Sequence, residues 1–167
     1  MKLILYRIFS FLLLPMAILF SVAVLLLLRA AFNNPAMFLP LFLIACIAIY
    51  TFASLNFLIR GIDGKKFLGR PSKDWLKVNA IASTVFALLM ITQCTIFLMH
   101  PDMLQQITAQ AKANAGTELN ISDAAFGDYL RIISYFFLVY AIVLFVHIII
   151  SFQYLKKYGY LFQNEKK

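Results

Sequence analysis

The residues with the greatest capacity for chemistry in this chain are polar side chains set within long apolar stretches. His147 lies in the apolar stretch 132–152, and three further candidates lie in or beside two other stretches: Asn56, Asn79 and Ser83. A histidine can bind a ligand or relay protons near neutral pH, and polar groups inside a membrane often mark ligand or ion sites. The same residue types can also form hydrogen bonds between helices that fix helix rotation. These four are therefore the candidate ligand-binding residues.

The spacing of these residues predicts that they share one layer. At 1.5 Å per helical residue, His147 lies about 13 Å from Lys156, and Asn56 lies about 6 Å from Arg60. Ser10, in the first apolar stretch, falls in the same layer. We expect His147 to face other helices and to find its hydrogen-bond partner among Ser10, Asn56, Asn79 and Ser83. A structural layer, a ligand site and a proton relay all remain open at this point.

Motifs for catalysis, metal binding or nucleotide binding do not occur in the sequence. It contains no HExxH, P-loop, GxSxG or CxxC pattern, and His100 and His147 are expected near opposite faces of the membrane, so that they could not share a metal. No carboxylate or cation lies near the centre of a stretch, whereas proton-coupled transporters depend on embedded carboxylates. Cys46 and Cys94 are expected to be packing residues. We predict no catalytic residue, no metal site and no cofactor.

The elements that must position these residues are four long apolar stretches, each expected to form a membrane-spanning helix. They cover residues 8–28, 36–59, 78–99 and 132–152. Each is as long as the roughly 20 residues needed to cross a bilayer. The chain is 63% hydrophobic and only 13% charged, which is typical of membrane proteins rather than soluble domains. We predict an all-α integral membrane protein, with residues 1–167 forming one transmembrane domain of four helices in two antiparallel hairpins.

The positive charges indicate how the helices are oriented. If the N-terminus is cytoplasmic, twelve of the fifteen Lys and Arg residues lie on that side, and only three lie outside: Arg29, Lys112 and Arg131. This bias predicts that both termini are cytoplasmic. The net charge of +8 is therefore a topology signal, and its distribution argues against a nucleic-acid partner.

The links between the stretches differ in length and composition. Asn33, Asn34 and Pro35 form a short turn between the first two. The cytoplasmic loop 60–77 contains Ser72, which we expect to cap the third helix. The outer loop 100–131 should hold a short surface helix near 102–113, and it contains a formal glycosylation sequon at Asn120.

The lack of motifs and of embedded charge favours a protein that acts through contacts. We expect an accessory or scaffold subunit of a larger membrane complex, not an enzyme, in the cell membrane and most simply a bacterial inner membrane. Its partners would be membrane lipids and other membrane subunits or further copies of itself. The alternatives are a small oligomeric transporter or channel, and a membrane enzyme or redox subunit with a site around His147.

Overall fold

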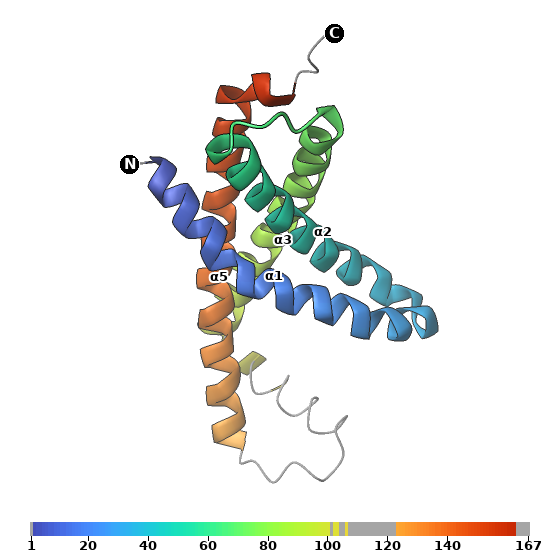
Figure 1. Ribbon diagram of the computed structural model, residues 1–167. Helices are drawn as coiled ribbons and strands as arrows, with labels where there is room; N and C mark the ends of the chain where they lie inside the picture. The colour runs from blue at the N-terminus through green and yellow to red at the C-terminus, as the bar shows by residue number, and fades with distance from the viewer. Residues whose placement is uncertain (1, 101, 104–105, 107–122, 163–167) are drawn as a thin grey trace. The chain divides into compact units, whose positions relative to one another are not determined.

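The computed structural model describes residues 2–100, 102–103, 106 and 123–162, and every regular element among them is a helix (Figure 1). The long helices are α1 (Lys2–Asn33), α2 (Phe38–Asn56), α3 (Arg70–Met99) and α5 (Asp123–Lys157). All four, with the short elements that extend α2, are long and apolar enough to cross a membrane. The predicted all-α architecture of four long apolar helices in two hairpins is confirmed, and the chain is a candidate multi-pass membrane protein.

The described residues group into two compact units. Among these residues, unit 1 comprises 2–86 and 143–162, and unit 2 comprises 87–100, 102–103, 106 and 123–142. Unit 1 contains α1, α2, the first part of α3 and the last part of α5, together with the polar residues that the sequence singled out. Unit 2 contains the remainder of α3 and α5. The surface helix expected at 102–113 falls mostly outside the described residues, and the sequon at Asn120 lies outside them altogether.

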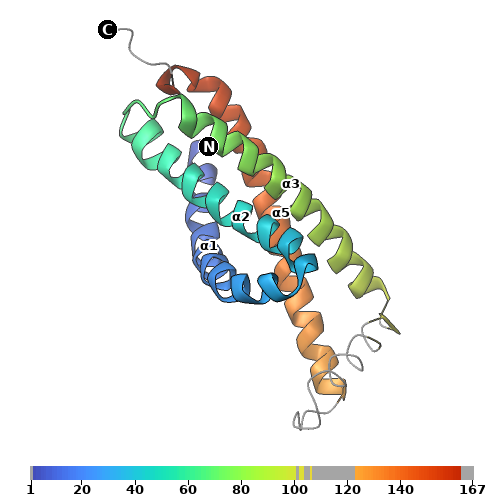
Figure 2. The same cartoon turned by 90° about the vertical axis from the view of Figure 1, so that its right-hand side faces the viewer.

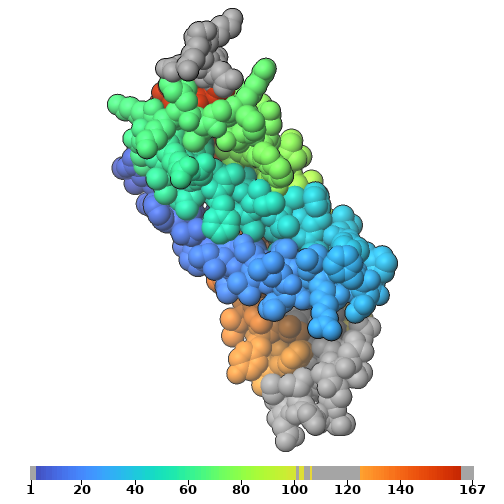
Figure 3. All heavy atoms as spheres, turned by 45° about the vertical axis from the view of Figure 1, so that its right-hand side comes forward, coloured from blue at the N-terminus to red at the C-terminus, as the bar shows by residue number. Residues whose placement is uncertain are grey.

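The first hairpin closes at the turn that the sequence predicted. The side chain of Asn34 accepts a hydrogen bond from the backbone N–H of Ala36 at 3.2 Å, and Pro35 begins a 3₁₀ turn, η1 (Pro35–Met37). The rings of Phe32 and Phe38 meet edge to face across the turn, with centroids 5.8 Å apart. α1 and α2 consequently run antiparallel from this turn (Figure 2). They lie against each other on the face of the molecule seen in Figure 3.

The helices extend beyond the apolar stretches into their polar flanks, and at the end of α2 the backbone hydrogen bonding changes from the α to the π pattern. α2 passes into a π-helix, η2 (Phe57–Asp63), and α3 begins at Arg70, so the predicted loop 60–77 is reduced to residues 64–69. The expectation that Ser72 caps this helix is wrong. Its hydroxyl lies inside α3 and donates to the Leu68 carbonyl at 2.8 Å. Gly69, at φ 72, makes the turn into the helix.

The C-terminal segment packs on the link between α2 and α3. A 3₁₀ turn, η3 (Gly159–Phe162), follows α5, and Leu161 accepts a hydrogen bond from the Leu68 N–H at 2.9 Å. The Phe162 ring contacts Phe57 with centroids 5.4 Å apart. We call this part of unit 1, formed by residues 57–77 and 154–162, the basic end, since eight of its residues are Lys or Arg.

Candidate functional site

A polar cluster around His147 occupies the interior of unit 1. The His147 side chain projects from α5 and is completely buried. Its Nε2 lies 2.9 Å from the Ser10 hydroxyl of α1, and its Nδ1 lies 2.8 Å from the Tyr50 hydroxyl of α2. Each ring nitrogen therefore has a hydrogen-bond partner on a different helix, so the imidazole joins three helices at one point.

The cluster continues from Tyr50 through two further hydroxyls. The Tyr50 oxygen lies 2.9 Å from the Ser151 hydroxyl, and Ser151 donates to the Tyr6 hydroxyl at 3.2 Å. Tyr6 in turn donates to the Ser54 carbonyl at 3.4 Å. All the side chains in this chain of hydrogen bonds are at most 1% exposed. The result is a continuous polar path that passes between α1, α2 and α5 without reaching solvent.

Aromatic rings cover the imidazole. The Tyr6 ring lies parallel to the His147 ring, with an interplanar angle of 5° and centroids 4.8 Å apart. The Tyr50 ring meets it edge-on at 5.7 Å, and the Tyr154 ring tilts against Tyr6 at 5.2 Å. Both nitrogens of His147 are thus engaged and one face of the ring is stacked. The geometry suits a rigid joint between helices better than a ligand site.

Counting hydrogens assigns the protonation of the ring. The Ser10 hydroxyl donates to the Tyr6 carbonyl at 2.8 Å, so it must accept a hydrogen from Nε2. The six contacts of the cluster require six hydrogens, whereas four hydroxyls and a neutral imidazole supply five. A second ring proton would complete the set, but it would bury a charge that faces hydroxyls rather than a carboxylate. In the neutral Nε2–H form, Tyr50 donates to Nδ1 and Ser151 donates to Tyr6, so the contact between Tyr50 and Ser151 is the one left without a hydrogen.

The other sequence candidates lie elsewhere in unit 1. The Asn79 amide is buried and donates to the Trp75 carbonyl of its own helix at 2.8 Å. The Ser83 hydroxyl is also buried, and it has no hydrogen-bond partner among the described residues. Asn56 is half-buried and lines a pocket at the basic end. The cluster therefore unites His147 with Ser10, as expected, but with none of the three other candidates.

Sequence reasoning missed the two tyrosines, Tyr6 and Tyr50. Tyr6 precedes Ser10 by one helical turn, which places both on the same face of α1, and this spacing was a usable signal. Tyr50 carried a weaker signal, because its ring is equally suited to apolar packing. In both residues the ring packs against the His147 imidazole while the hydroxyl joins the polar path.

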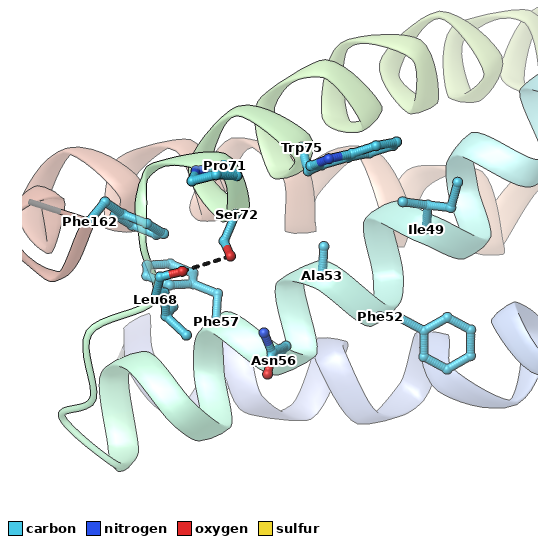
Figure 4. Close-up of a pocket in the computed structure, with 10 residues that line it drawn as sticks. All are labelled: Ile49, Phe52, Ala53, Asn56, Phe57, Leu68, Pro71, Ser72, Trp75 and Phe162. Carbon is cyan, nitrogen blue, oxygen red and sulfur yellow. Dashed lines mark hydrogen bonds between the residues drawn. The ribbon is translucent and has the colours of Figure 1, made fainter. Parts of the chain in front are cut away.

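A pocket of about 460 Å³ opens at the basic end between α2, the start of α3 and η3 (Figure 4). Its walls are mainly apolar and aromatic, formed by Ile49, Phe52, Ala53, Phe57, Leu68, Pro71, Trp75 and Phe162. The polar lining comes from Asn56 and from Ser72, whose hydrogen is already donated to Leu68. Trp75 of α3 lies across the pocket from Ala53 of α2 (Figure 4). The pocket is thus an apolar hollow with one available amide.

Unit 2 contains a smaller apolar pocket of about 200 Å³ between α3 and α5. It includes the buried thiol of Cys94, and the Ser134 hydroxyl beside it donates to the Leu130 carbonyl of its own helix at 2.8 Å. The Ser134 hydroxyl is thus satisfied within its own helix, and the Gln93 amide is the other polar side chain in the lining.

Groups of three or more residues suited to metal binding do not occur among the described residues. Comparison of the chain with protein-family models, with curated proteins and with solved structures finds no match.

Proposed function

We propose that this protein is a non-catalytic membrane subunit that acts by binding other membrane-spanning chains. The observation that carries the proposal is that the hydrogen bonds of His147 use both of its ring nitrogens. Both ring nitrogens bond side chains of this same chain, at 2.9 and 2.8 Å, and the ring is completely buried. A ligand, redox centre or substrate would need a free ring nitrogen or an open path to it. The cluster instead supports a structural role, in which polar contacts fix how three helices pack.

The exposed surface supports the same proposal. In the second half of α1, residues 25–30 are exposed on every side of the helix, although four of them are leucines. Six consecutive residues cover more than one helical turn, so no other described part of the chain covers this segment. Such a segment can be surrounded by lipid, or it can be covered by the helix of a partner. In a contact protein we expect the partner helix to lie here.

The proposed orientation places both termini in the cytoplasm of a cell whose membrane follows the positive-inside rule, most simply a bacterial inner membrane. The twelve-to-three distribution of Lys and Arg supports it. In this arrangement the basic end faces the cytoplasmic leaflet, and the turn at Asn34 faces outward.

Site-specific photocross-linking in native membranes tests the proposal. A photoreactive amino acid at Leu26, which is 73% exposed, should yield one discrete cross-linked membrane protein, and that protein should co-purify with the full chain in mild detergent in a fixed ratio. Ile81 on α3, 60% exposed, is the matched control and should give only diffuse or no products. The His147→Gln variant should keep the cross-link, because a side-chain amide can still donate and accept.

Two results would overturn the proposal. One is a chain that purifies alone, with no product from Leu26. The other is a bound chromophore or quinone that disappears in His147→Gln while the helices remain folded, which would favour a redox or ligand-binding subunit instead.

A further inference from the structure

We propose that the pocket at the basic end binds one anionic phospholipid from the surrounding membrane. The acyl chain would lie in the apolar hollow between α2 and α3, and the headgroup phosphate would lie near Asn56 and Lys73. This inference does not depend on the proposed partner subunit, since it concerns a different surface and needs no second protein.

The lining suits an acyl chain. Ile49, Phe52 and Ala53 follow one face of α2, and Trp75 lies across from them on α3 (Figure 4). Trp75 is 60% exposed, and tryptophan favours the depth where acyl chains meet headgroups. The pocket volume of about 460 Å³ is within the range of ligand sites, and it can hold part of one acyl chain. A hollow with these walls is therefore suited to an acyl chain at the boundary between hydrocarbon and headgroups.

The rim of the pocket suits an anion. The Lys73 ammonium lies 6.0 Å from the centroid of the Phe162 ring, and Phe162 is itself part of the lining. The Lys73 ammonium is thus near the wall of the pocket that Phe162 forms. The Asn56 amide provides two N–H donors that a phosphate oxygen can accept.

The wider charge balance favours an anionic headgroup over a zwitterionic one. Residues 57–77 contain six Lys or Arg residues and two carboxylates, Asp63 and Asp74. Asp63 already pairs with Arg7 of α1 at 2.6 Å, which leaves Asp74 as the other acidic side chain of this segment. The surplus of cations beside an apolar hollow matches a molecule with one negative end and one hydrocarbon end.

Quenching of Trp75 fluorescence by brominated lipids provides a direct test. Trp75 is the single tryptophan of the chain, so emission excited at its red edge reports on the pocket alone. The full chain is reconstituted in phosphatidylcholine vesicles in which a rising fraction of lipid carries brominated acyl chains. The brominated lipid is either phosphatidylglycerol or phosphatidylcholine. Random contact predicts equal quenching by the two. We expect brominated phosphatidylglycerol to quench at about fivefold lower mole fraction.

Two variants connect the selectivity to the pocket. Lys73→Gln should weaken the preference for phosphatidylglycerol about fivefold, the change that corresponds to about 1 kcal/mol for one cation near a membrane surface. Lys157→Gln is the matched control. Its ammonium also lies over an aromatic ring, 5.5 Å from the Tyr158 centroid, but neither residue lines the pocket, so the preference should persist. Ala53→Phe should fill the hollow and remove the preference, with helix content checked by circular dichroism.

Three outcomes would overturn the proposal. The first is equal quenching by the two brominated lipids. The second is a preference that Lys73→Gln leaves unchanged while Lys157→Gln reduces it, which would indicate a diffuse surface charge. The third is loss of the preference in about 10 mM inorganic phosphate at constant ionic strength, which would indicate a site for soluble phosphate instead of a lipid.

Discussion

Removing the Tyr50 hydroxyl isolates the energetic contribution of the His147 cluster. Tyr50→Phe keeps the ring that meets the imidazole edge-on but deletes the oxygen that lies 2.8 Å from Nδ1 and 2.9 Å from Ser151. Ser151 can still donate to Tyr6 at 3.2 Å, so the one group left without a partner is the Nδ1 acceptor of His147. Because both Tyr50 and His147 are completely buried, no water can replace the lost hydroxyl without repacking.

The expected loss follows from the cost of a buried unsatisfied acceptor. Such a group costs about 1–3 kcal/mol, and hydrogen bonds between membrane helices contribute about 0.6 kcal/mol on average. We expect Tyr50→Phe to lower the free energy of unfolding by about 2 kcal/mol. In a His147→Leu background no Nδ1 remains to be left unpaired, so the same change should cost less than about 1 kcal/mol.

Equilibrium unfolding by dodecyl sulfate in mixed micelles, followed by circular dichroism, measures both quantities. Tyr160→Phe supplies the matched control, since Tyr160 is 54% exposed and loss of its hydroxyl should cost less than about 0.5 kcal/mol. The reasoning is refuted if Tyr50→Phe costs no more than the control. It is also refuted if Tyr50→Phe lowers the free energy of unfolding equally with and without the imidazole. The loss would then not arise from an unpaired Nδ1 acceptor.

Further predictions concern the ring proton, an ion pair and the topology. Nitrogen NMR of the labelled imidazole should find His147 neutral at pH 7 with its hydrogen on Nε2, and a hydrogen on Nδ1 alone would contradict the count of donors. Arg7→Gln and Asp63→Asn, singly and together, should give a coupling energy below about 1 kcal/mol that falls with added salt, since the paired side chains are 47% and 37% exposed. A cysteine placed at Lys66 should resist impermeant reagents added to intact cells, whereas one at Lys112 should react, and the reverse pattern would invert the proposed orientation.

The large features of the fold could be predicted because they depend on simple quantities. The length and apolarity of four stretches determine four long helices, and Asn34 with Pro35 determines where the first hairpin turns. The ends of the helices could not be predicted in the same way. Hydrophobicity stops near residue 59, but the backbone continues its hydrogen bonding through η2 to Asp63, and the next helix starts before its expected cap at Ser72.

The polar cluster was predicted only in part, for two physical reasons. Helix rotation decides which side chains meet, and spacing along one helix does not give its rotation relative to another. In addition, a polar residue in a helix can satisfy itself on a carbonyl one turn back, as the Asn79 amide does with Trp75. Such a residue needs no partner on another helix. His147 has no comparable local solution in the structure, and its need for partners was therefore the reliable part of the prediction.

The contact between Ser10 and His147 joins residues 137 positions apart, and this separation bears on how the protein is made. A ribosome that adds about 5–20 residues per second needs roughly 7–27 s to travel that distance. During this interval α1 and α2 can pair, and the Ser10 hydroxyl can already donate to the Tyr6 carbonyl of its own helix. The Tyr50 hydroxyl, in contrast, gains its contact with His147 only after α5 has been made. α5 is made after the first hairpin and carries the group that completes its hydrogen bonding, so release of a chain that lacks α5 would leave the Tyr50 hydroxyl of that hairpin without His147 and Ser151.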